Sequence, residues 1–137
     1  MSLVDPTGYI LTTIRDDAAV AALTTRVRGG EPAPGDAKVP YQRFIVLVRL
    51  GASRLKRAPI QEVRIAARCY GTTYSDAAAL AGAVSDAIHA VGHRINSGGV
   101  AIFGSFDDGG EGATADPDTH QPMETVIVQV NASTALL

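Results

Sequence analysis

Two of the three histidines stand four residues apart, the spacing at which two side chains on one helix can share a metal ion. His89 and His93 fall in a segment with helical periodicity, and His120 is the natural candidate for a third ligand. A zinc protease would need glutamate directly after the first histidine, and position 90 is alanine. Solvated histidines are therefore the preferred interpretation, and a small metal-binding or ligand-binding domain is an alternative.

The other residue types that carry catalysis lack the partners they need. The acidic residues of the segment 107–111 do not have the spacing of a calcium loop. Asp116 and Asp118 flank a proline, and no base accompanies them. Cys69 is the single cysteine and lies in an apolar run, which is typical of a core residue. We predict no catalytic residue, no metal site and no cofactor, and a protein that is not an enzyme.

The composition indicates one domain that comprises residues 1–137. The chain is 46% hydrophobic, so it can bury a core, and it is only 5% aromatic, so that core is mainly aliphatic. The net charge of −2 does not favour a general attraction to nucleic acid. A secretion signal and a membrane-spanning apolar run are not found in the sequence. A single cysteine excludes an internal disulfide, and we expect a cytoplasmic protein.

Helical periodicity is clearest in the segment 74–94, where we predict a central helix at about residues 75–93. Leu80, Val84 and Ile88 recur at helical spacing and form one apolar stripe. Ser75 is the predicted N-cap, with an acidic residue in the first turn. A short N-terminal helix is predicted to begin at Asp5-Pro6 and to end near Arg15, followed by a helical turn that reaches Leu23.

Two runs of alternating side chains predict a long antiparallel β-hairpin, with strands at 40–50 and 60–70 and a turn between them. Their pattern indicates a sheet with one apolar face and one polar, basic face. Further strands are predicted at 100–106 and 123–131. Between them, the polar segment 107–121 is predicted to be a long acidic loop, and residues 132–137 a flexible tail. The fold class is therefore α+β, a mostly antiparallel sheet packed against the central helix and the short N-terminal helix.

Charges of opposite sign are separated along the chain. Seven of the 12 basic residues lie between positions 43 and 68, and six of the 14 acidic residues lie between positions 107 and 124, where Lys and Arg are missing. The candidate interface residues taken from these two groups are Arg49, Arg54, Lys56, Arg57, Arg64, Arg68, Asp107, Asp108, Glu111, Asp116 and Asp118.

Three interpretations of this charge separation are open. The two groups can be ordinary solvated surfaces. They can also meet between copies, so that the basic hairpin of one copy contacts the acidic loop of the next and the contacts close into a ring. A local nucleic-acid surface on the hairpin is the third, and the scarcity of aromatic residues and the acidic total count against it.

The order of these signals resembles the tail terminator, or tail completion, proteins of long-tailed bacteriophages, also called tail-to-head joining proteins. The resemblance covers most of the chain. Its most specific part is VRIAARCYGTTYSDAAALAGAVSDAIH at 63–89, a strand that runs through Tyr-Gly into an Ala-rich helix ending near a histidine. The other parts are DDAAVAALTTRV at 16–27 after the opening helix, Val39-Pro40-Tyr41 before a strand, and Asp118-Thr119 before the last strand.

The resemblance implies a structural virion protein that forms a ring, typically hexameric, on the head-proximal end of the tail tube. The ring stops tube polymerisation and joins the tail to the head. The implied partners are further copies of the chain, the tail tube protein and a head-completion or connector protein, with no membrane and with DNA only passing through the lumen. The implied location is the tail or neck of the virion, and the host cytoplasm during assembly. Another neck or head-closure connector protein is the alternative within this class.

Overall fold

The fold is seen in a computed structural model that describes residues 7–31, 41–54, 61–90, 94–95, 101–117 and 119–133, with the backbone alone described at 52–54, 94–95, 101–113 and 133. The elements are α1 (Thr7–Asp16), α2 (Ala18–Leu23), β1 (Val27–Gly29), β2 (Phe44–Arg54), β3 (Gln61–Tyr70), α3 (Tyr74–His89), β4 (Arg94–Ile95), β5 (Ala101–Ala115) and β6 (Pro122–Ser133).

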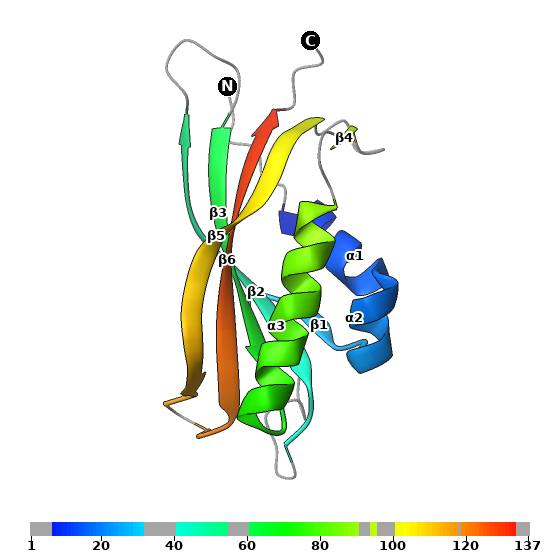
Figure 1. Ribbon diagram of the computed structural model, residues 1–137. Helices are drawn as coiled ribbons and strands as arrows, with labels where there is room; N and C mark the ends of the chain where they lie inside the picture. The colour runs from blue at the N-terminus through cyan, green and yellow to red at the C-terminus, as the bar shows by residue number, and fades with distance from the viewer. Residues whose placement is uncertain are drawn as a thin grey trace.

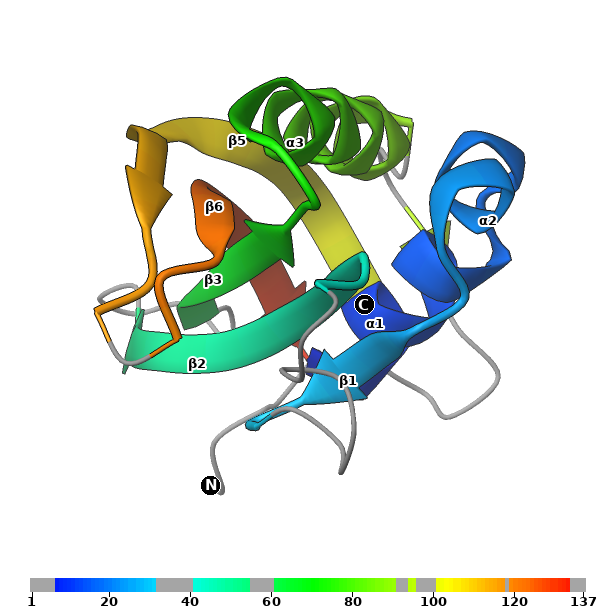
Figure 2. The same cartoon turned by 90° about the horizontal axis from the view of Figure 1, so that it is seen from below.

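The strands form one sheet in the order β1-β2-β3-β6-β5-β4, in which the β1–β2 pair is parallel and the other pairs are antiparallel. All three helices lie on the same side of this sheet (Figure 1). Seen from below, the sheet curls around the helical layer (Figure 2). This arrangement confirms the predicted α+β class, the long β2–β3 hairpin and the mostly antiparallel sheet.

Helix α3 begins one turn after a glycine that the packing requires. A Cβ atom on Gly71 would collide with the backbone nitrogen of Ala77, so the strand-to-helix connection can pass close to the helix only at a glycine. Thr73 is the N-cap, and its hydroxyl accepts a hydrogen bond from the backbone N–H of Asp76 at 3.1 Å. Ser75 lies inside the helix, so its predicted capping role is wrong.

The Asp76 carboxylate joins the start of α3 to the segment before β2. Arg43 Nε donates to both of its oxygens at 2.7 and 2.8 Å, and the backbone N–H and the hydroxyl of Thr72 donate to Oδ2 at 2.9 and 3.1 Å. Partial burial raises the pKa of Asp76, but these hydrogen bonds and the charge of Arg43 lower it more, so the pKa lies below its ordinary value of 3.8. The acidic residue in the first turn therefore also fixes the helix against the sheet.

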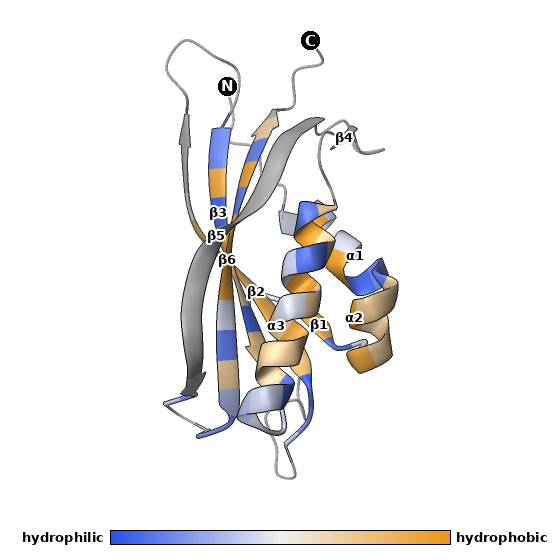
Figure 3. Ribbon diagram, in the orientation of Figure 1, coloured by the Kyte–Doolittle hydropathy of each residue, from blue (hydrophilic) through white to orange (hydrophobic). Residues whose placement is uncertain are grey.

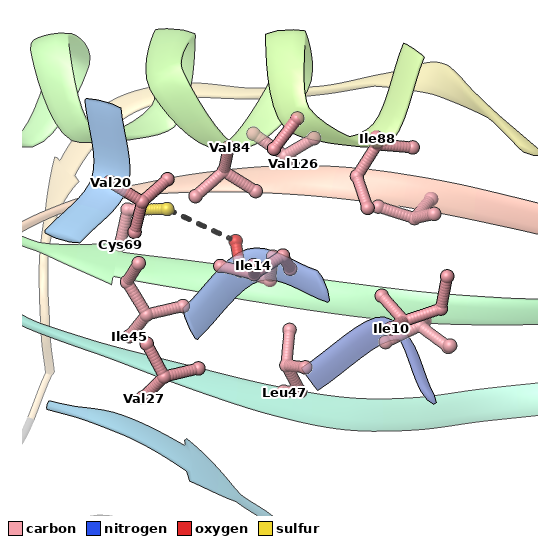
Figure 4. Packing of buried hydrophobic residues seen from close by; sticks show 14 of the residues in the cluster. Ile10, Ile14, Val20, Val27, Ile45, Leu47, Cys69, Val84, Ile88 and Val126 are labelled. Carbon is pink, nitrogen blue, oxygen red and sulfur yellow. Dashed lines mark hydrogen bonds between the residues drawn. The ribbon is translucent and has the colours of Figure 1, made fainter. Parts of the chain in front are cut away.

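The apolar stripe of α3 is buried as predicted. Leu80, Val84 and Ile88 are all 0% exposed and belong to one cluster with side chains of α1 and of the strands. Figure 4 shows Val84 and Ile88 pointing from α3 toward Ile10 and Ile14 of α1. The predicted central helix is confirmed as far as His89, and residues 91–93 lie outside the described part of the chain.

The two N-terminal helices follow the predicted pattern closely. Helix α1 ends at Asp16, one residue after the predicted end, while Asp5-Pro6 lies outside the described residues. Asp17 caps α2, because its carboxylate accepts hydrogen bonds from the backbone N–H groups of Ala19 and Val20, each at 3.1 Å.

Four predicted strand boundaries are wrong, and the first is the start of β2, which lies at Phe44 instead of the predicted position 40. Strand β2 continues to Arg54, beyond the predicted end at 50, and β6 includes Ala132, which is fully buried, and Ser133. The predicted polar loop 107–121 is a strand as far as Ala115. The start of β5 agrees with the strand predicted at 100–106. Beyond that point β5 is specified by pairing with β6, across three register shifts, and the hydrophobic pattern of 107–115 carries no such signal.

Removing part of the α3 stripe should destabilise the fold. We expect Leu80→Ala to lower the free energy of unfolding by about 3 kcal/mol, because it leaves a cavity between α3 and the sheet. Denaturant unfolding monitored by circular dichroism measures the change. Ala78→Ser, at an exposed position of the same helix, should change the free energy of unfolding by less than about 0.5 kcal/mol, and equal effects of the two substitutions would refute this packing.

The lowered pKa of Asp76 predicts a stability difference that depends on pH. The ionised carboxylate stabilises the fold fully above 3.8, the ordinary value, and this contribution is lost as the pH falls through the lower folded-state pKa. The stability advantage of wild type over Asp76→Asn should therefore decrease as the pH falls below that value. The stability advantage of wild type over Arg43→Gln should be smaller, because Thr72 still donates hydrogen bonds to the Asp76 carboxylate in that variant. Unfolding curves that differ by a constant amount at every pH would contradict the assignment.

Candidate assembly interface

One face of the sheet carries the helices, and the described residues place no helix on the other, which we call the open face. Among them, Val63, Ile65, Ala67 and Cys69 of β3 point to the helices and are fully buried. The residues between them point to the open face. By register, the open face of β2, β3 and β6 includes Phe44, Val46, Val48, Gly51, Glu62, Arg64, Ala66, Arg68, Tyr70, Met123, Thr125, Ile127, Gln129 and Asn131, and Leu50 follows Val48 along the apolar row of β2.

The open face is apolar at one end, so the predicted single polar, basic face is wrong. Phe44 stacks on Tyr70 with ring centroids 4.3 Å apart and planes at 8°. Val46 and Met123 complete a second buried cluster with them. Strand β2 carries apolar side chains on both faces. Phe44 and Val46 lie on the open face, and Ile45 and Leu47 lie in the helical core. A pattern of that kind is typical of a strand that is buried on both sides.

The basic residues of the hairpin do not form one surface. Arg64 and Arg68 are exposed on the open face. Arg49 pairs with Ile65, which lies in the helical core, so the register assigns it to the opposite face. Arg54 ends β2 opposite Gln61. Lys56 and Arg57 lie outside the described residues.

Three of the predicted acidic interface residues lie on β5, which is separated from β2 by β3 and β6. Asp107 pairs with Val128 and Glu111 pairs with Thr125, while Asp108 falls at a register shift. Asp118 lies outside the described residues. The described basic and acidic strands therefore occupy opposite sides of the sheet.

Asp116 has a structural role within the chain. Its Oδ2 accepts a hydrogen bond from the Tyr70 hydroxyl at 3.0 Å, and its Oδ1 accepts one from the backbone N–H of Thr119 at 3.0 Å. Burial, together with the bond to Asp116, raises the pKa of Tyr70 to about 12. The carboxylate thus fixes the β5–β6 turn against β3, and its role as an interface residue stays a prediction.

Gln121 is a fully buried residue that the sequence reasoning missed. Its Nε2 donates to the carbonyl oxygen of Gln42 at 2.7 Å and to that of Gly71 at 3.2 Å. Nearby, the Tyr41 hydroxyl donates to the carbonyl oxygen of Thr119 at 2.8 Å. These bonds join the β5–β6 turn to the entry of β2 and to the start of α3. A lone glutamine in a polar run carries no periodicity that would have identified it.

The candidate chemical groups are not brought together. His89 and His120 are exposed, His93 lies outside the described residues, and the part of the chain that is described contains no group of three or more metal-ligating side chains. Burial raises the pKa of the Cys69 thiol, with a further contribution from the charge of Glu124, which disfavours the nucleophilic thiolate. No described helix is long and apolar enough to cross a membrane.

Comparison with known proteins identifies a family and a similar fold. A family model described as "Tail completion protein gp17" matches residues 8–134. A chain in a solved structure entitled "Virion of native gene transfer agent (GTA) particle" matches with a TM-score of 0.61 at 15% identity, over 90% of each chain. At that identity the likeness concerns the fold. A comparison with curated proteins finds no match.

The family match covers nearly the whole length of the chain, including every described helix and strand except the first residue of α1. Proteins of this family are structural components of phage tails, and they act by association with other tail or head proteins. The chain therefore belongs to the tail completion protein gp17 family and is a structural protein of the virion.

Proposed function

We propose that this chain, acting as one domain, forms a homo-oligomeric ring on the head-proximal end of the tail tube. Six copies are the expected number. The ring stops polymerisation of the tube and then joins the tail to the head. The family match over residues 8–134 is the observation that carries this proposal. Copies made in the host cytoplasm assemble with the tail tube protein on one side and a head connector on the other.

The layered architecture supports a role in assembly. Since the described helices all pack on one side, the open face exposes Arg64 and Arg68, while half-buried Val48 and Ile127 lie between them. A sheet face with this mixture of apolar and charged side chains is suited to contact with another protein. Figure 3 shows the alternation of hydrophobic and hydrophilic residues along β3 and β6.

The separation of charge across the sheet supports a head-to-tail contact. Basic β2 and β3 stand on one side and acidic β5 on the other, so the basic side of one copy can face the acidic side of the next. Contacts between two different surfaces of identical subunits form a ring when the rotation closes. Opposite charges orient the copies and speed their encounter more than they increase affinity.

The mass of the purified protein in solution, measured by light scattering at low and high salt, is the direct test. A ring that dissociates as salt increases would support the charged contact. Electron microscopy of tail tubes polymerised with and without the protein then tests termination, since capped tubes should stop growing. Protein that remains monomeric and leaves tube length unchanged would refute the proposal.

Reversal of one open-face charge should weaken assembly while leaving the fold intact. We expect Arg64→Glu to raise the concentration needed for half-assembly about tenfold at low salt and less at high salt, because screening reduces the lost attraction. Light scattering over a dilution series measures both values.

The matched control adds the same change of −2 in net charge to the helical side. The pair Ala78→Glu and Ala79→Glu occupies exposed positions of α3. It should assemble as wild type does. Equal weakening by the control and by Arg64→Glu would show that net charge, and not the open face, governs assembly.

A further inference from the structure

The apolar row of β2 on the open face continues beyond the point where burial ends. Phe44 is 0% exposed, Val46 is 2% exposed and Val48 is half-buried, but Leu50 is 51% exposed. Soluble domains usually replace the residue at such a position by a polar one, and a single exposed leucine needs no explanation by itself. Three further features of this position suggest a function for the exposed leucine.

The backbone presents Leu50 at a β-bulge. Arg49 pairs with Ile65 and Gly51 pairs with Arg64, so Leu50 is the extra residue that has no partner on β3. Bulges bend a strand and direct a side chain away from the regular face, and they are frequent at functional positions. The leucine is therefore held outward by the geometry of the strand itself.

Beside this bulge, the described residues place no strand on the outer edge of β2. Strand β1 pairs only with Ile45, Val46 and Leu47, and the N–H of Gly30 donates to Leu47 at 2.7 Å. From Val48 to Arg54, none of the described residues forms a strand on that side. An unpaired edge of this kind is a site where another chain can dock.

The charge around the bulge identifies the chain that fits. Arg64, opposite Gly51 of the bulge, is exposed on the open face, while Arg49 precedes Leu50 on the helical side and Arg54 ends the strand. The complementary strand in this protein is β5, whose sequence includes Asp107, Asp108 and Glu111 but no Lys or Arg, and whose outer edge pairs with β4 only at Ala101 and Ile102.

We propose that Leu50 is the apolar anchor of a contact in which the acidic β5 strand of a second copy docks on β2 between Val48 and Arg54. The contact must form between copies, because β3 and β6 separate β2 from β5 within one chain and the two strands diverge at the Leu50 end (Figure 1). This inference rests on the proposed ring, and it specifies which surfaces meet. Tail tube protein is the competing occupant.

Tyr74 is the matched control, since it is the second exposed large hydrophobic side chain among those the structure describes, 53% exposed at the start of α3. We expect Leu50→Asp to raise the concentration for half-assembly about tenfold or more, as loss of a central anchor does. Tyr74→Asp should change it less than about twofold. Thermal unfolding of both variants confirms that each is folded, and Leu50→Ala gives the same comparison without a new charge.

Cross-linking tests the partner directly. Protein carrying Leu50→Cys, mixed with protein carrying Glu111→Cys, should form disulfide-linked pairs after mild oxidation, and Tyr74→Cys with Glu111→Cys should not. The native thiol at Cys69 is fully buried and does not compete.

The outcomes separate this inference from the proposed ring. If Leu50→Asp protein forms rings normally, the docking of a second copy at this edge is overturned and the ring itself stands. The same conclusion holds if those rings form but fail to cap tubes. Wild-type protein that never assembles, alone or on tubes, would overturn both.

Discussion

Burial of the α3 stripe against the sheet is the interaction on which the rest of the structure depends. Leu80, Val84 and Ile88 have no exposed surface, and the side chains that bury them come from α1 and from the central strands. Because α1 and α2 complete this layer from the same side, every described helix is used on one face. The hydrophobic effect that forms the core therefore also leaves part of the opposite face, where Arg64 and Arg68 are exposed, available for assembly.

A second set of interactions, all polar, holds the lower end of the sheet together. Gln121 joins the entry of β2 to the end of β3, Asp116 binds Tyr70, and Asp76 binds Arg43. Gln121 is fully buried and the bond between Tyr70 and Asp116 is partly buried, so loss of either would leave an unsatisfied partner, whereas Arg43 is exposed and water can replace its partner. They explain how β5, which has almost no hydrophobic pattern of its own, is kept in register with β6: the turn between the two strands is fixed at its base.

The parts of this fold that could be predicted from the sequence are those with a strong period. Helix α3, the β2–β3 hairpin and β6 each repeat apolar residues at the spacing of their element. The first part of β5 was predicted, as a strand at 100–106. Its continuation could not be predicted, because glycines and acids make up all of 107–112 and only pairing with β6 makes them a strand. The sequence shows that basic residues gather at 43–68 and acidic residues at 107–124. The division of Arg49 from Arg64 between the two faces follows from the period of two: Arg49 alternates with Ile45 and Leu47 of the helical core, whereas Arg64 lies between two core residues of β3.

The edges of the sheet show how copies of the chain can associate specifically and form a closed ring. Short β1 and β4 each cover part of an edge, and three register shifts disrupt β5, devices that discourage indiscriminate pairing of strands. Among the described residues, the part of β2 that no strand covers carries an exposed leucine in a basic strand, and an apolar and acidic counterpart complements it. The two complementary surfaces lie on opposite sides of one subunit, so a copy that uses one still presents the other. Each added copy therefore repeats the same contact, and a closed ring is the arrangement in which no copy is left with an unpaired surface.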